Sequence, residues 1–132
     1  YAGRPAAANP ALAATGRKQY VTDTVVATMP RGEGEKAEVI FINPGRRLTD
    51  PELDEEFEKL GLKQADPYSL TAANEADPAF ADTHPNATHW KDADGNWCYI
   101  AFRRWSGVGR HVGVDRSGSD WSVDWWFGGL RK

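Results

Sequence analysis

The sequence predicts a single α+β domain in which short helices pack against a small antiparallel sheet. Strand-like and helix-like patterns are segregated along the chain rather than alternating, which favours an antiparallel sheet over a doubly wound parallel one. A length of 132 residues with 40% apolar side chains is enough for one modest core. No internal period indicates a repeat protein.

The N-terminal part predicts an arm followed by two strands. Residues 1–18 are rich in Ala, Gly and Pro with hardly any large apolar side chain, so they cannot offset their ordering entropy and are expected to form a flexible arm or linker. The folded domain is expected to span residues 19–132. Residues 19–29 and 36–43 are two β-rich runs, and the polar, glycine-containing residues 30–35 predict a hairpin or loop between them.

The middle of the chain predicts helices. In "LTDPELDEEFEKLGL", residues 48–62, Thr49 or Asp50 can cap a helix, Pro51 suits its first turn and Gly61 supplies the stop. Two Asp-Pro pairs, at residues 66–67 and 77–78, predict two short helical turns further on.

Strand patterns return from His89 onward. Residues 89–105 predict two strands joined at "DADGN", because Asp94-Gly95 is a strong hairpin-turn signal. Residues 110–115 and 121–127 predict two further strands, the last of them rich in Trp.

Charge and composition restrict the function classes. The net charge of −3 and pI near 5.6 argue against charge-driven binding of the whole chain to duplex DNA or an anionic membrane. From Trp97 to the end, however, six basic residues exceed three acidic ones. The only cysteine, Cys98, excludes an intramolecular disulfide and a thiolate zinc cluster. No apolar run reaches the roughly 20 residues of a membrane span and no signal-peptide pattern is present, so a soluble chain of unassigned compartment is expected.

Neither catalysis nor a metal or cofactor is expected. The spacing of His84, His89 and His111 matches no metal-ligand motif. The segment "DADGN" alternates polar residues as a calcium loop does, but its glycine comes too early and no bidentate Glu follows, so a tight turn is the better interpretation. Cys98 lies in an apolar run and is interpreted as a buried side chain. No Ser/His/Asp set or phosphate-binding glycine loop is found.

An unusual composition in residues 106–124 indicates a binding surface. His111, Gly113 and Asp115 alternate with Val112 and Val114, which on a strand places the valines on one face and the other three on the opposite face. These three share neither size, charge nor polarity. An ordinary solvated face would carry Lys, Glu and Thr, yet residues 106–124 contain no Lys, Glu, Gln or Met.

The segment "RWSGVGRHVGVDRSGSDWSVDWWFGGLRK" resembles the C-terminal variable region of target-binding proteins diversified by a diversity-generating retroelement. In this family a template is copied into the gene with its adenines randomised, so that AAC and AAT codons become NNC and NNT codons. Those codons encode none of Lys, Glu, Gln, Met and Trp. Every residue from Ser106 to Asp124 except Trp121 belongs to the set they do encode.

The resemblance implies a variable region at about residues 103–124, with a fixed framework between the variable positions. The implied ligand-binding positions are Arg103, Ser106, Val108, His111, Gly113, Asp115, Ser117, Gly118, Ser119, Ser122, Val123 and Asp124. The implied framework is Trp105, Arg110, Val112, Val114, Arg116, Trp121, Trp125, Trp126 and Phe127. The family commonly has a C-type lectin-like fold, which agrees with short helices, a small antiparallel sheet and Trp-rich C-terminal strands. The chain lacks the glycine-rich, Ser-Trp-containing insert of several members with that fold.

These observations predict a binding protein, not an enzyme, that recognises a variable macromolecular target, a protein, through a surface without a deep pocket. The N-terminal arm is expected to tether the domain to a larger assembly or a second subunit. Display on a cell or virus surface fits this prediction, whereas a membrane or nucleic-acid partner is not expected. Two alternatives stay open: a single-stranded nucleic-acid-binding module that uses its Arg and aromatic side chains, and a carbohydrate-binding lectin.

Overall fold

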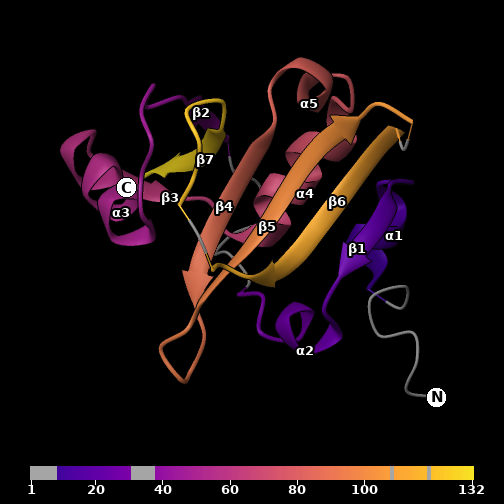
Figure 1. Ribbon diagram of the computed structural model, residues 1–132, viewed down its shortest axis with the longest axis horizontal. Helices are drawn as coiled ribbons and strands as arrows, with labels where there is room; N and C mark the ends of the chain where they lie inside the picture. The colour runs from indigo at the N-terminus through magenta and orange to yellow at the C-terminus, as the bar shows by residue number, and fades with distance from the viewer. Residues whose placement is uncertain (1–8, 31–37, 108, 119) are drawn as a thin grey trace.

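The computed structural model describes residues 9–30, 38–107, 109–118 and 120–132. Its centre is a seven-stranded sheet with the strand order β1-β6-β5-β4-β7-β2, and β3 pairs with β7 beside this path (Figure 1). The strands are β1 Lys18–Val21, β2 Ile40–Ile42, β3 Leu62–Gln64, β4 Asn86–Lys91, β5 Trp97–Trp105, β6 Gly109–Arg116 and β7 Trp126–Arg131. The helices are α1 Pro10–Ala14, α2 Asp23–Val26, α3 Asp50–Lys59, α4 Pro67–Ala76 and α5 Phe80–Thr83.

The predicted α+β class is confirmed, but the sheet is mixed rather than purely antiparallel. The pairs β4-β5, β5-β6, β2-β7 and β3-β7 are antiparallel, whereas β1-β6 and β4-β7 are parallel. Each parallel pair joins strands that are distant in sequence, because parallel neighbours need a long crossover connection. The hairpin signals in the sequence carried no information on such crossovers.

The prediction that residues 1–18 form a flexible arm is wrong for residues 9–18. Asn9 caps α1 by accepting hydrogen bonds from the backbone N–H groups of Ala11 and Leu12. Leu12 is fully buried in the main core, and Arg17 is 94% buried, with its guanidinium donating to three backbone carbonyls. Leu12 and Arg17 therefore anchor a segment whose composition is typical of a linker. Residues 1–8, the rest of the predicted arm, lie outside the described residues.

The first predicted strand, residues 19–29, is also partly wrong. Its first residues form β1, but residues 23–26 form the short helix α2. Val25 and Val26 are buried in the core there, and burial outweighs the weak strand preference of β-branched side chains. Within residues 36–43, β2 covers residues 40–42, and the predicted loop at residues 30–35 lies almost wholly outside the described residues.

The predicted helix in residues 48–62 is confirmed as α3. Thr49 and Glu52 form a reciprocal capping box, in which each side chain accepts a hydrogen bond from the other residue's backbone N–H. Asp66 caps α4 as its Asp-Pro pair predicted, but α4 is a full helix of ten residues rather than a short turn. Asp77 ends α4, and the second helical turn is α5.

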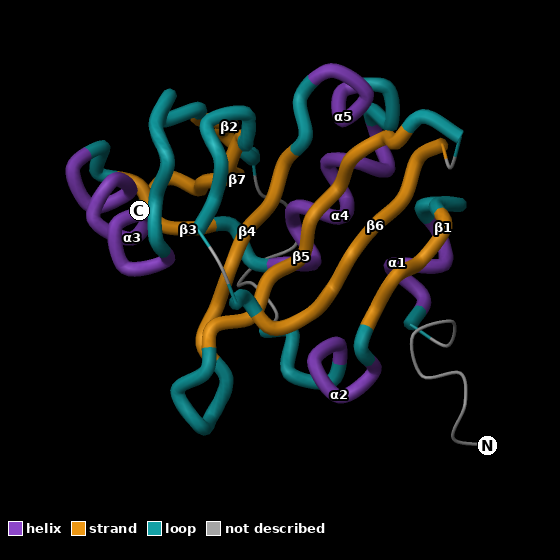
Figure 2. Tube along the Cα trace, viewed as in Figure 1, coloured by secondary structure: helices purple, strands orange, loops and turns teal. Residues whose placement is uncertain are grey.

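The predicted hairpin of residues 89–105 is confirmed as β4 and β5. In the turn between them the Asp92 carboxylate accepts hydrogen bonds from the backbone N–H groups of Asp94 and Asn96. This turn and the one after β5 lie at opposite ends of the long strands (Figure 2). The predicted strand at 121–127 is wrong at its start: Trp121 makes an isolated bridge with Leu48, and β7 begins only at Trp126.

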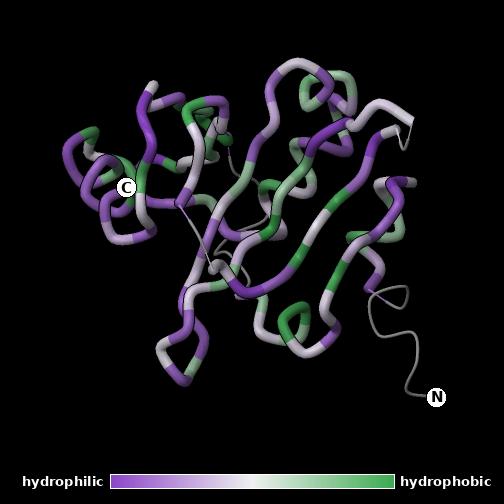
Figure 3. Tube along the Cα trace, viewed as in Figure 1, coloured by the Kyte–Doolittle hydropathy of each residue, from purple (hydrophilic) through white to green (hydrophobic). Residues whose placement is uncertain are grey.

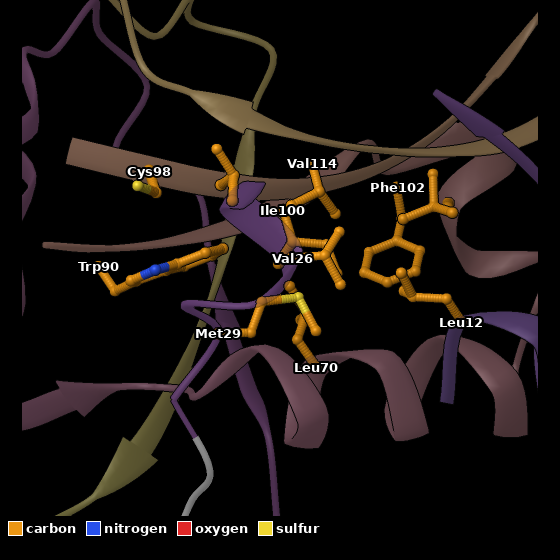
Figure 4. Packing of buried hydrophobic residues seen from close by; sticks show 12 residues of the cluster. Leu12, Val26, Met29, Leu70, Trp90, Cys98, Ile100, Phe102 and Val114 are labelled. Carbon is orange, nitrogen blue, oxygen red and sulfur yellow. The ribbon is translucent and has the colours of Figure 1, made fainter. Parts of the chain in front are cut away.

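Within the described residues, the two hydrophobic clusters leave part of one sheet face without a helix over it. Ile100, Phe102 and Val114 on β5 and β6 pack against Leu12 of α1 and Leu70 of α4 (Figure 4). Apolar and polar segments alternate along these two strands (Figure 3), and Val112 and Val114 are fully buried, as the alternation predicted. The second cluster gathers under α3 and around the C-terminal strand: Leu48, Leu53, Phe57, Ala87, Ala101, Trp121 and Phe127. Between this cluster and β1, the described residues leave a pocket on the sheet face opposite α4.

Candidate functional site

A pocket of about 370 Å³ lies on the sheet face opposite α4, and we call it the aromatic pocket. The strands contribute Tyr20 of β1, Tyr99, Ala101, Arg103 and Trp105 of β5, and His111 and Gly113 of β6. The segment between β6 and β7 contributes Ser117, Gly118, Asp120, Trp121 and Trp125. Its volume falls within the range of small-molecule and side-chain binding sites.

The register of three strands produces the hollow. Arg103 on β5 lies opposite His111 on β6, and in the next row Ala101 lies opposite Gly113, which pairs with Tyr20 on β1. Directly paired residues project to the same face, so each row forms a line of side chains across the pocket. Ala101 and Gly113 are small and form the floor, while larger side chains stand on both sides of them.

The Arg103 guanidinium is held between two indole rings. Its Cζ lies 5.0 Å from the ring centroid of Trp105 and 5.5 Å from that of Trp125, which is cation–π distance. Within the described part of the chain, the Arg103 side chain makes neither an ion pair nor a hydrogen bond, and its Nε is buried without a partner. The pocket therefore contains a cation that lies near two indole rings and has no carboxylate of the described residues within ion-pair distance.

His111 forms the wall beside Arg103 and is 4% exposed. Its ring packs edge-on against Tyr20, with centroids 5.4 Å apart, and lies 4.4 Å from the Trp105 ring. Burial lowers the pKa of His111, and although an interaction with the Gly109 backbone opposes this, the charges of Arg103 and Arg17 lower the pKa further. The pKa is below its ordinary value of 6.5 overall, so the neutral ring predominates at pH 7. Its Nδ1 has no hydrogen-bond partner among the described residues. Among the described residues that line the pocket, Arg103 is consequently the one cation at neutral pH.

A buried carboxylate positions the segment that closes the pocket. Asp50, in the first turn of α3, accepts hydrogen bonds from Trp121 Nε1 at 2.9 Å and from Ser117 Oγ at 2.6 Å. It also bonds His89 Nδ1 at 2.6 Å, and His89 Nε2 reaches Asp54 at 2.9 Å. Through these contacts the helix N-terminus fixes both ends of the segment 117–121.

The pKa directions of Asp50 and His89 both favour the charged form of each group. Burial by itself would raise the pKa of Asp50, but the hydrogen bonds from His89, Ser117 and Trp121 outweigh it, so the pKa of Asp50 is lowered. Burial would lower the pKa of His89, but its hydrogen bonds with Asp50 and Asp54, and the charges of both, raise that pKa overall. The imidazolium form of His89 can donate one hydrogen bond to each carboxylate, as the two distances require.

The structure brings together five of the predicted ligand-binding positions in the aromatic pocket: Arg103, His111, Gly113, Ser117 and Gly118. Of the others, Ser106, Asp115, Val123 and Asp124 are exposed and Ser122 is half-buried, but none lines the pocket. Val108 and Ser119 lie outside the described residues. His111 is a buried wall residue rather than an exposed one, since Tyr20 and Trp105 cover its ring.

Sequence reasoning missed two features of the site. It expected a surface without a deep pocket and did not foresee the hollow of about 370 Å³, open to solvent, that the small floor residues leave between the aromatic side chains. It also omitted Tyr20, Tyr99 and Asp120. Tyr99 could have been found, because it shares the alternation of Arg103 and Trp105 along one strand. Tyr20 gave no signal, since its place depends on the parallel pairing of β1 with β6.

Neither a metal site nor a membrane-spanning helix is found in the described part of the chain. No group of three or more His, Cys, Asp or Glu side chains there could hold a metal ion. Among the helices described, none has the length and apolar character to cross a membrane. No family model, curated protein or solved structure matches the chain. The aromatic pocket is therefore the feature from which a function can be argued.

Proposed function

We propose that this protein is a binding protein that recognises a macromolecular target, a protein, through the aromatic pocket and its rim. The observation that carries this proposal is the combination of exposed aromatic side chains with an unneutralised arginine. Tyr20 and Trp105 are each 45% exposed, their rings are 6.4 Å apart, and both border the pocket that contains Arg103. Trp, Tyr and Arg are the residue types that most often dominate the energy of protein interfaces.

We further propose that residues 103–124 are a diversified surface on a C-type lectin-like domain. The short helices, the largely antiparallel sheet and the Trp-rich C-terminal segment support the fold assignment. The buried Trp121 and the half-buried Trp125 support the division into framework and variable positions, because they hold a segment whose neighbours Gly118 and Asp124 are exposed. Changes at these exposed positions would alter the surface with little effect on the core.

A display experiment tests the binding surface. One library randomises Ser106, Gly113, Gly118, Ser122 and Asp124, and a control library randomises five exposed positions on or near the helices: Glu55, Glu58, Lys59, Lys63 and Glu75. Both libraries are selected against the same panel of unrelated proteins. The first library, called the pocket library, should yield binders about ten times more often, because Gly113 and Gly118 line the pocket and the other three positions directly follow or precede Trp105, Trp121 and Trp125 in the chain.

Trp105→Ala should abolish binding in most selected clones, since that ring is the exposed anchor. Equal yields from the two libraries, or binders indifferent to Trp105→Ala, would reject the proposal. Selected pocket residues that confer only salt-sensitive binding to single-stranded oligonucleotides would favour the nucleic-acid alternative. Calcium-dependent binding of glycans would favour a lectin.

The diversification is tested separately by the gene's surroundings. The proposal requires a near-copy of the last ninety or so bases of the gene, differing only at adenines, beside a gene for a reverse transcriptase. A complete genome without such a copy would refute diversification. The binding function would then rest on the display experiment alone.

A further inference from the structure

The side chain of Arg103 has the position and environment of a ligand-binding group. It projects from β5 into the aromatic pocket, and no carboxylate of the described residues lies within ion-pair distance of it. Other arginines of the chain differ: Arg110, for example, forms a bidentate pair with Asp82 at 2.9 and 2.7 Å. Arg103 instead stacks against two indoles, which restricts its motion before any ligand arrives.

The polar surroundings of Arg103 favour a single negative charge on the ligand. His111 beside it is neutral at pH 7, so Arg103 is the one cation among the described residues that line the pocket. Lys18, which pairs with His111 in the same row, is not one of them, and its Nζ lies 5.7 Å from the Tyr20 ring centroid. Asp120 lines the same pocket, and Asp115 lies on the same sheet face opposite Tyr99. These two carboxylates repel anions, and they repel a doubly charged phosphate more strongly than a singly charged carboxylate.

We propose that the aromatic pocket binds a carboxylate group, which pairs with the Arg103 guanidinium between the indoles of Trp105 and Trp125. This inference rests on the proposal that the pocket is the target-binding site, and it names the chemistry of the group that enters it. A guanidinium can hold a carboxylate through two parallel N–H···O hydrogen bonds, and the low polarity of the flanking indoles strengthens that pairing. On a protein target, the group is the side chain of Glu or Asp or the terminal carboxylate.

Small acids provide the direct test with the intact chain. Benzoate is the main probe, because its flat ring can lie against the indoles while its carboxylate meets Arg103. Benzamide is its neutral counterpart and phenyl phosphate its doubly charged one. N-acetylglutamate N-methylamide carries only a side-chain carboxylate, and N-acetylalanine carries only a terminal one, and neither has an aromatic ring, so these two probes distinguish the sources on a protein.

Binding is followed by NMR through the indole N–H signals. Benzoate should shift the signals of Trp105 and Trp125 with a Kd of about 1 mM, typical of a single small anchor, while the signal of Trp90 in the other core cluster stays in place. Benzamide and phenyl phosphate should each bind at least about tenfold more weakly. Of the two amino-acid derivatives, the one that binds more tightly identifies the source.

Two arginine variants make the assignment specific. Arg103→Gln should weaken benzoate binding at least about tenfold, whereas Arg104→Gln, the same change on the neighbouring residue of the opposite sheet face, should leave it unchanged. Arg103→Lys keeps the charge but loses the planar fork, and it should weaken binding several-fold without loss of folding. This variant tests the pairing even where Arg103→Gln unfolds.

The inference would be overturned if benzamide bound as tightly as benzoate, or if phenyl phosphate bound more tightly than benzoate. It would also be overturned if Arg103→Gln or Arg103→Lys bound benzoate as the wild type does, or if no acid at roughly 20 mM shifted the indole signals of Trp105 and Trp125. These outcomes are distinguishable from failure of the proposed function. Selected binders that need Trp105 but not Arg103 would refute the carboxylate and leave the binding surface intact. If benzoate binds but neither library yields protein binders, the proposed protein-binding function is refuted and the carboxylate site remains.

Discussion

Replacing Asp50 by Asn should destabilise the protein by about 3 kcal/mol at mildly acidic pH. The wild-type carboxylate is 7% exposed and bonds three groups: the imidazole of His89, the indole N–H of Trp121 and the hydroxyl of Ser117. Asn retains one acceptor oxygen but loses the charge that pairs with His89. Removing one partner of a fully buried ion pair costs about 3 to 5 kcal/mol. The lower end applies because His89 keeps its second carboxylate, Asp54.

The pH dependence of this loss follows from the two pKa directions. The raised pKa of His89 means that its contribution is complete below the ordinary value of 6.5 and disappears as the pH rises through the folded-state pKa. The lowered pKa of Asp50 means that its contribution is complete above the ordinary value of 3.8 and disappears as the pH falls through the folded-state pKa. The difference between wild type and Asp50→Asn should therefore be largest near pH 5 to 6 and shrink towards alkaline pH.

Urea unfolding followed by Trp fluorescence measures this difference across the pH range, and melting curves should show a decrease in Tm of roughly 10 °C near pH 5.5. Ser117→Ala is the matched comparison, because it removes one hydrogen bond from the same carboxylate and no charge. It should cost about 1 kcal/mol with little pH dependence. A loss below about 1 kcal/mol for Asp50→Asn at pH 5.5, or a loss that grows with alkaline pH, would show that the buried pair does not hold the segment as described.

Two further predictions concern packing. Gly129→Ala should destabilise the protein by about 1 to 3 kcal/mol, because the new Cβ would lie 2.6 Å from a ring carbon of the buried Phe57 on α3. Gly118→Ala is the control: its Cβ would lie in open space, and it should change the free energy of unfolding by under about 0.5 kcal/mol. Similar losses for the two variants in urea titrations would contradict the described packing around Gly129. Arg17→Met should lower the free energy of unfolding by about 2 to 4 kcal/mol, since it leaves three backbone carbonyls without the hydrogen bonds that the guanidinium donates. The control is Lys18→Met at the exposed neighbouring residue, which should lower it by under about 0.5 kcal/mol. If the two substitutions have equal melting temperatures, residues 9–18 do not belong to the folded domain.

Local signals in the sequence predicted local structure well. The cap at Thr49 or Asp50 with Pro51 behind it, and the Asp94-Gly95 turn, act within a few residues, and both the helix and the hairpin they predicted are present. The alternation around Val112 predicted which side of β6 is buried, because a strand allows only two faces. These features can be predicted without knowing which residues pack against them.

Features that depend on distant partners could not be predicted in the same way. Residues 9–18 look like a linker until Leu12 and Arg17 meet a core formed by residues much later in the chain. The pocket depends on the parallel register between Tyr20 and Gly113, which no hairpin rule supplies. The roles of Asp50 and His89 were also missed, since their contacts join residues 39 positions apart.

The floor of the aromatic pocket gives residue 113 control over the shape of the whole surface. A Cβ built on Gly113 would meet only ordinary neighbours, the Tyr20 carbonyl at 3.6 Å and the Tyr99 ring at 3.9 Å, and the glycine does not occupy the left-handed backbone region. A larger residue at this single position would fit the same backbone and rise between the aromatic walls. One substitution at residue 113 would therefore change a concave surface that accepts a protruding group into a flat or convex one. The kind of target that fits the surface would change, while the folded framework stays the same.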